Sequence, residues 1–165
     1  MKKDNNAFKK EDFQIWLDAM PLKIEQLKTI LKESKSPYNF SIDSLDLLEN
    51  YILSNYNNIE QIKSENESSH ILDLLARYLG EVMRKNIKHT GWYIITDNKK
   101  HSLYGLPVIY FLSPSFTVLS PYYEILACII KRKGNYFSSI VNALKNDIDK
   151  KNRAVIFENH FQMPD

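Results

Sequence analysis

Residues 70–84, HILDLLARYLGEVMR, carry the clearest helical pattern in the chain. Apolar side chains recur there every three or four residues, and others widen the apolar sector to more than half of the helix circumference. They are Ile71, Leu72, Leu74, Leu75, Ala76, Tyr78, Leu79, Val82 and Met83. Because so broad an apolar surface needs cover from two sides, the pattern predicts a central helix against which the rest of the chain packs.

Further helices are predicted before this segment. Apolar side chains keep the same spacing over residues 13–20 and 24–31, which indicates two helices. A third helix is predicted from Ser41, a favourable N-cap, through Ile52. The sequence leaves open whether residues 55–69 form a loop or an exposed helical lead-in.

Three short segments rich in β-branched and aromatic residues follow the central helix, at residues 92–96, 107–112 and 116–119. The connections at 97–100 and 113–115 have turn-like residues, and no stretch between the segments could form a crossover helix. The sequence therefore predicts an antiparallel β-meander.

Two helices are predicted after these strands. Ser120 followed by Pro121 is typical of an N-cap and the first helical residue. This helix is predicted to end in the basic residues 131–133, with Gly134 as its C-terminal cap. A last helix is predicted over residues 137–148 from its apolar spacing.

The order of elements predicts an α+β fold in which N-terminal helices and a central helix pack on the small meander and two C-terminal helices follow. The length of 165 residues fits one domain. Within it we expect a helical N-terminal extension at 1–36 and a core at 38–150. Residues 155–157 suggest a short strand, and 158–165 a frayed tail.

Composition and charge narrow the range of partners. Lys and Arg number 22 against 20 Asp and Glu, so the net charge of +2 does not attract nucleic acid or an anionic membrane. The longest apolar runs, 106–112 and 125–130, are far shorter than the roughly 18 to 20 residues of a membrane span. No apolar stretch follows the basic N-terminus, so we expect no secretory signal and a cytoplasmic protein without membrane attachment.

The sequence has no motif that predicts catalysis, a cofactor or a metal. Its four histidines are scattered, and its four glycines form neither a phosphate-binding loop nor a dinucleotide fingerprint. The single cysteine, Cys128, lies in an apolar run, where burial disfavours a reactive thiolate. We therefore expect no enzyme activity, no cofactor and no metal site.

One set of charged residues stands out on the central helix: Asp73, Arg77, Glu81 and Arg84 follow one another at spacings of four, four and three. Such spacing predicts a structural ladder of ion pairs. Gly80 lies between Arg77 and Glu81, in the interior of the predicted helix. Glycine at such a position destabilises a helix by about 1 kcal/mol relative to alanine, which indicates that another backbone packs closely there. Glu81 is then expected to be partly buried and bonded to the sheet or to a loop.

Tyrosines supply the candidates for partner binding, because exposed tyrosines are common at recognition surfaces. They are Tyr104, Tyr122 and Tyr123. Tyr104 lies in the connection before the second predicted strand, where we expect it to be exposed.

Five motifs occur together over roughly residues 38–144. They are Phe40-Ser41-x-x-Ser44-Leu45-x-x-Leu48-Glu49-x-Tyr51, Arg77-Tyr78-Leu79-Gly80-Glu81-x-x-Arg84, the strand of Trp92, Gly105-Leu106-Pro107-Val108 and Ser120-Pro121. Together they resemble a loosely defined group of small bacterial proteins, some of which are similar to immunity proteins of polymorphic toxin systems. The resemblance implies a non-enzymatic protein that blocks a cognate toxin, and it brings no catalytic residue with it.

Three functions follow as hypotheses. The first is a cytoplasmic protein-binding protein that occludes a toxin, by shape and aromatic contacts because its charge is near neutral. The alternative is a small enzyme or ligand-binding domain with a cleft near Glu81 and Arg84. A weaker alternative is a nucleic-acid-associated protein that uses the basic residues 131–133 beside Tyr136.

Overall fold

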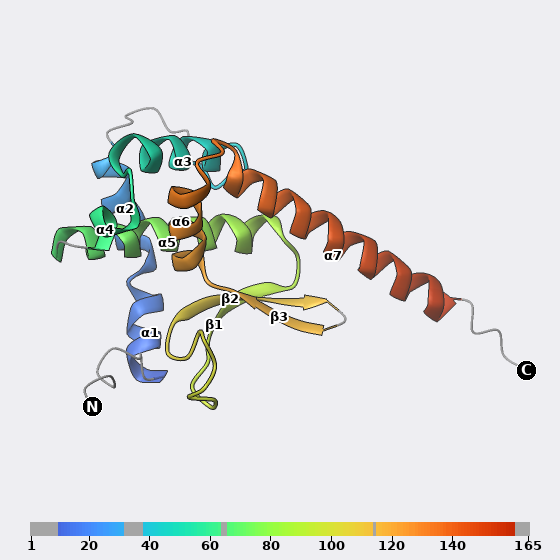
Figure 1. Ribbon diagram of the computed structural model, residues 1–165. Helices are drawn as coiled ribbons and strands as arrows, with labels where there is room; N and C mark the ends of the chain where they lie inside the picture. The colour runs from blue at the N-terminus through green and yellow to red at the C-terminus, as the bar shows by residue number, and fades with distance from the viewer. Residues whose placement is uncertain (1–9, 32–37, 64–65, 114, 161–165) are drawn as a thin grey trace, which may run out of the picture.

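The computed structural model describes residues 10–31, 38–63, 66–113 and 115–160, with side chains at all of these except 66–69, 112–113, 115–116 and 151–160. Within these residues the chain forms seven helices and one three-stranded sheet (Figure 1), which confirms the α+β class. The helices are α1 (Lys10–Asp18), α2 (Met20–Ile30), α3 (Ser44–Asn55), α4 (Ile59–Lys63), α5 (Asn66–Asn86), α6 (Pro121–Lys131) and α7 (Tyr136–His160). The strands are β1 (Thr90–Ile94), β2 (Pro107–Ser113) and β3 (Ser115–Leu119). Across the described parts of the chain, no helix combines the length and the apolar character that crossing a bilayer demands.

Helix α5 lies at the centre of the fold, as its apolar pattern predicts. It contacts the helices α2, α3, α4, α6 and α7 as well as the strands β1 and β2. Figure 1 shows it running across the molecule, with α3 on one side and the sheet on the other. Tyr78 and Leu79 are fully buried on it. The N-terminal helices reach the same core through Trp16 and Leu27, so the segment expected as an extension shares in the core.

The sheet is the predicted antiparallel meander, with strand order β1-β2-β3. Trp92 of β1 is paired with Ile109 of β2, so these side chains share the face of the sheet that packs toward the helices. The first strand begins at Thr90, two residues before the predicted start at 92.

Helix α3 begins later than predicted. Ser41 is not its N-cap, since the helix starts at Ser44, although the Ser41 Oγ still accepts a hydrogen bond of 3.3 Å from the Ser44 N–H. The cause lies at Phe40, which has a left-handed φ of 64° and stacks on Tyr78 with ring centroids 5.3 Å apart. Residues 41–43 turn the chain away from this contact before α3 begins at Ser44.

Helix α6 ends on Arg132 rather than on the predicted cap Gly134. Arg132 has a left-handed φ of 47°, and its N–H donates to the Cys128 carbonyl over 2.9 Å. Its guanidinium donates to the carbonyls of Leu53 and Tyr56 at the end of α3, at 2.9 and 3.0 Å. A cation at a helix C-terminus is favourable, and this contact holds Arg132 in the cap position.

Two other predictions change at the ends of helices. The strand suggested at 155–157 is wrong, because α7 continues through these residues to His160. No glycine or proline interrupts α7, so each added residue extends the helix. The suggested tail at 158–165 is helical as far as residue 160, and 161–165 lie outside the described residues. The stretch at 55–69 contains the short helix α4 and the first turn of α5.

Candidate functional site

Asp73 and Arg77 join three helices through a partly buried network. Their side chains form an ion pair with Nε and Oδ2 at 2.7 Å. Asp73 also accepts hydrogen bonds from the indole N–H of Trp16 on α1 at 2.8 Å and from the Tyr122 hydroxyl on α6 at 2.5 Å. The Arg77 guanidinium lies over the Trp16 ring at 3.9 Å from its centre. These contacts hold α1, α5 and α6 together.

Tyr122 is therefore turned inward. Burial raises the pKa of its hydroxyl well above the usual range, and the neighbouring Asp73 carboxylate raises it further. The hydroxyl therefore stays protonated and donates to Asp73. This role accounts for Tyr122 without a partner protein.

Glu81 and Arg84 form a second, separate pair. The Arg84 guanidinium donates two hydrogen bonds of 2.8 Å to the Glu81 carboxylate, which also accepts one of 2.9 Å from the Trp92 indole. Burial alone would raise the pKa of Glu81, but the bonds from Arg84 and Trp92 outweigh it and lower the pKa. Glu81 is thus bonded to the sheet, as the sequence led us to expect.

Gly80 explains why this pair sits where it does. A Cβ placed on Gly80 would overlap the six-membered ring of Trp92. The close packing inferred from this glycine is present, although the neighbour is a side chain rather than a backbone. Trp92 also meets Trp16 edge to face, with centroids 4.8 Å apart, so the glycine admits an aromatic pair between α1 and β1.

Glu49 is an important residue for which the sequence pattern predicts no role. It is fully buried on α3 and accepts hydrogen bonds from the backbone N–H groups of Gly134, Tyr136 and Phe137, at 2.6, 2.6 and 3.2 Å. These donors open α7, so a carboxylate from another helix caps it. Burial and the nearby Glu49 raise the pKa of the Cys128 thiol to about 12, which leaves that thiol protonated. The signal in the sequence is one acid on an otherwise apolar helix face.

The outer surface of α6 is apolar. Tyr123 is 47% exposed and Ile130 is 67% exposed, with half-buried Leu126 and Ala127 between them. At 100° per residue these four side chains fall within an arc of roughly 100° on one side of the helix. We refer to Tyr123, Leu126, Ala127 and Ile130 as the α6 face. Of the three tyrosine candidates, Tyr123 alone belongs to it.

Tyr104 lies at the base of the β1–β2 connection and is half-buried rather than exposed. It forms an isolated bridge with Ile95, and its N–H donates to the His101 carbonyl at 3.0 Å. Tyr104 therefore helps to hold the two ends of the connection together.

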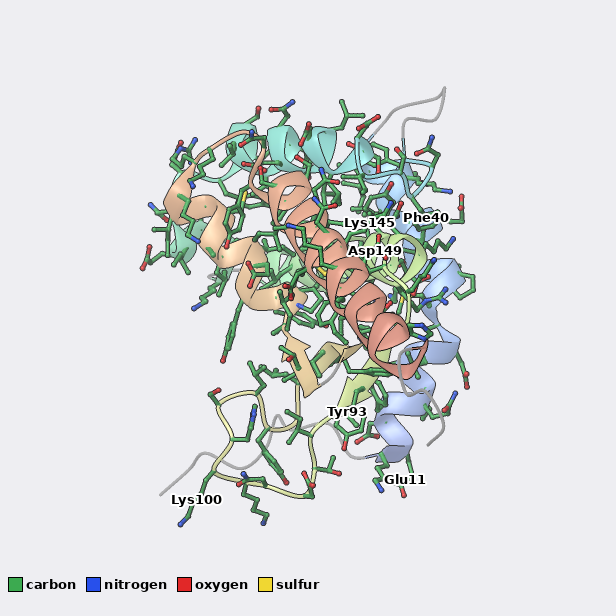
Figure 2. All side chains as sticks on the ribbon, turned by 90° about the vertical axis from the view of Figure 1, so that its right-hand side faces the viewer. Glu11, Phe40, Tyr93, Lys100, Lys145 and Asp149 are labelled. Atoms are coloured by element: carbon green, nitrogen blue, oxygen red, sulfur yellow. The ribbon has the colours of Figure 1, made fainter. Side chains whose placement is uncertain are left out.

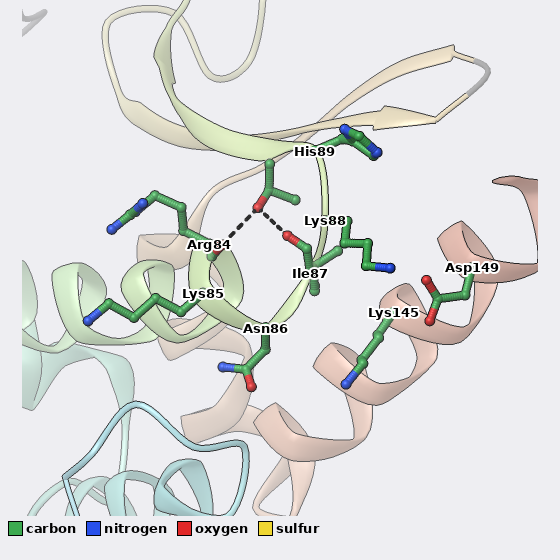
Figure 3. A pocket seen from close by; sticks show the side chains of 9 residues that line it. Arg84, Lys85, Asn86, Ile87, Lys88, His89, Lys145 and Asp149 are labelled. Atoms are coloured by element: carbon green, nitrogen blue, oxygen red, sulfur yellow. Dashed lines mark hydrogen bonds between the residues drawn. The ribbon is translucent and has the colours of Figure 1, made fainter.

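A pocket of about 360 Å³ lies between the end of α5 and helix α7, and its lining includes Arg84, Lys88, His89, Lys145 and Asp149. In Figure 3 the Lys88 side chain points toward α7, whereas the Arg84 side chain points away from it. Glu81 does not line this pocket. Where a cleft was expected near Glu81 and Arg84, the structure has an ion pair, and the pocket beside it is lined mainly by basic side chains.

Among the residues that the structure describes, no cluster of three or more His, Cys, Asp or Glu side chains could hold a metal ion. The chain matches no protein-family model, no curated protein and no solved structure. The surfaces of this molecule are therefore the basis on which its function is inferred.

Proposed function

We propose that the protein is a non-enzymatic cytoplasmic binding protein, an immunity protein that neutralises a cognate bacterial toxin by covering part of its surface. The α6 face is the observation that carries this proposal. It gives the protein an apolar surface to place against a partner.

A helix at the surface normally presents charged and polar side chains to water. In α6 the only charged residues are Glu124 and Lys131. Both contact the Tyr136 hydroxyl on one flank of the helix, at 2.7 and 3.0 Å, so neither lies between Tyr123 and Ile130. The α6 face therefore exposes apolar area that contact with another protein would remove from water. An exposed tyrosine beside aliphatic side chains is a frequent centre of such contacts.

The buried and partly buried carboxylates support a binding role over a catalytic one. Asp73, Glu81 and Glu49 each accept several hydrogen bonds from within the chain. Their hydrogen bonds hold the helices and the sheet together. If one of these carboxylates bound a substrate instead, hydrogen-bond donors inside the protein would lose their acceptor.

The test is affinity capture from the native lysate with tagged protein, followed by mass spectrometry. The chain offers a matched pair of variants, because Ile130 on α6 and Ile15 on α1 are each 67% exposed. We expect wild type and Ile15→Asp to retain a stoichiometric partner that Ile130→Asp loses. Capture of the same partner at the same yield by Ile130→Asp would contradict the role of the α6 face. Capture of no partner by the wild type would contradict the proposed function.

A further inference from the structure

The connection between β1 and β2 is far longer than its strands require. β1 ends at Ile94 and β2 begins at Pro107, so residues 95–106 join two strands that pair directly. Hairpin loops usually have about 2–5 residues, and loops that approach about 12–15 residues are uncommon and are often functional. We call residues 95–106 the β1–β2 loop.

The base of this loop is closed by backbone contacts. The Gly105 N–H donates to the Ile95 carbonyl at 2.9 Å, and Gly105 has a positive φ of 68° that lets the chain turn back. Ile95 and Tyr104 form a bridge beside it. The two ends of the loop are therefore held side by side, as in compact Ω-loops.

The tip of the loop is also ordered by its own hydrogen bonds. Asn98 accepts one at its side chain from the Lys100 N–H, at 3.1 Å, and one at its carbonyl from the His101 N–H, at 3.0 Å. The His101 ring then accepts one of 3.0 Å from the Leu103 N–H. These local hydrogen bonds favour one conformation of the tip without a partner.

This ordered tip contributes little to the core. Its exposed residues are Asp97, Asn98, Lys99, Lys100 and Ser102. Figure 2 places Lys100 at the outer end of the loop, far from Phe40 and Lys145. Ordering a loop costs conformational entropy, and the exposed tip residues offset little of it by burial. Preorganisation of this kind lowers the cost of binding, so an ordered tip suits a binding role.

Charge defines what the tip could bind. Lys99 and Lys100 are adjacent and exposed, and neither forms an ion pair with any residue that the structure describes. We propose that the β1–β2 loop inserts into an acidic recess of the protein partner, where Lys99 and Lys100 pair with Asp or Glu side chains. The inference rests on the proposed function and names the chemistry of its partner. Charges that a partner covers interact more strongly than exposed ones.

The position of the loop agrees with this role. In Figure 2 the β1–β2 loop and helix α6 lie on the same side of the molecule, while α7 faces the viewer. A partner that covers α6 on this side can therefore also receive the loop. A nucleic-acid strand is the less suitable occupant, because binding one takes a cationic groove with aromatic platforms, and the exposed tip residues include no aromatic side chain.

The test titrates isotope-labelled full-length protein with a blocked hexaglutamate peptide and follows the backbone amide resonances. We expect shifts at residues 97–102 that weaken as salt is added and that hexaglutamine does not cause. Lys99→Glu/Lys100→Glu should bind at least about tenfold more weakly. The matched control Lys88→Glu/Lys145→Glu makes the same change of net charge at the cationic pocket and should bind as the wild type does.

Shifts centred on residues 84–90 and 145–149 would overturn the proposal in favour of the pocket. Stronger shifts with a single-stranded oligodeoxythymidylate than with hexaglutamate would overturn it in favour of nucleic acid. A partner captured equally by wild type and Lys99→Glu/Lys100→Glu, but lost by Ile130→Asp, would overturn the role of the loop alone and leave the proposed function standing.

Discussion

The Trp92 indole occupies the space that a side chain at position 80 would fill, so that Gly80 and Trp92 specify each other across the contact between α5 and β1. The same ring donates to Glu81 and packs against Trp16. One glycine thus determines how the central helix meets both the sheet and the first helix.

Gly80→Ala should therefore destabilise the protein, although alanine favours helices. Displacing the Trp92 ring costs roughly 1–3 kcal/mol, as other overpacked cores show, and the better helix propensity recovers about 1 kcal/mol. Urea denaturation should give a net loss in unfolding free energy of up to about 2 kcal/mol. In a Trp92→Leu background the clash is gone, so Gly80→Ala should cost nothing or stabilise. An equal cost in both backgrounds would contradict the packing described above.

Glu49 should be essential to the start of α7. Glu49→Gln keeps the shape of the side chain but replaces one acceptor oxygen by an NH2 group that faces backbone N–H donors. We expect a loss of about 2 kcal/mol in unfolding free energy. Hydrogen exchange at Tyr136 and Phe137 should speed up as the capped turn opens. Asp46→Asn is the control, because Asp46 accepts only from the Ser138 hydroxyl among the described contacts between α3 and α7, at 2.6 Å, and the amide oxygen can still do so. Equal losses for the two variants would argue against capping by Glu49.

Tyr122 and Tyr123 should respond differently to loss of the hydroxyl. Tyr122→Phe removes a donor from Asp73 and should lower the unfolding free energy by about 1–2 kcal/mol. Tyr123→Phe alters an exposed side chain and should stay within about 0.5 kcal/mol of wild type. Thermal and urea unfolding of the two variants side by side would check this. A larger effect at Tyr123 would mean that the α6 face is not solvent-exposed.

The lowered pKa of Glu81 predicts part of the acid sensitivity of the fold. The unfolded chain takes up a proton near pH 4.5, whereas the folded protein does so at lower pH. The stabilisation from Glu81 is therefore complete above about pH 4.5 and is lost as pH falls through the folded-state pKa. Glu81→Gln should flatten the fall of unfolding free energy in that window. Arg84→Gln, which removes the contact that lowers the pKa most, should flatten it in the same direction.

A steeper acid dependence in Glu81→Gln would contradict this assignment. Urea denaturation at a series of pH values from neutral to below the window gives the required slopes.

Local sequence patterns predicted the fold class well. The period of α5 and the runs of β-branched residues in β1 and β2 are properties of neighbouring residues, which is why the central helix and the meander were visible. The contact of Gly80 was also foreseeable, because a glycine inside a helix has a cost that close packing explains.

Contacts between distant residues were beyond such patterns. Arg132 ends α6 because its guanidinium reaches α3, and Phe40 delays α3 because its ring stacks on Tyr78. The same holds for Tyr122, whose inward direction depends on Asp73, 49 positions away in the sequence. Nothing local distinguished it from its exposed neighbour Tyr123.

The candidate partners are a cognate toxin or the product of the gene next to this one. The most direct test of the proposed function is a growth assay in which that neighbouring product is co-expressed with variants of this protein. We expect the neighbouring product to stop growth, wild type and Ile15→Asp to restore it, and Tyr123→Ser/Ile130→Asp to fail although it folds. Full protection by Tyr123→Ser/Ile130→Asp would contradict neutralisation through the α6 face. A neighbouring product that is harmless on its own would contradict the pairing of a toxin with this protein.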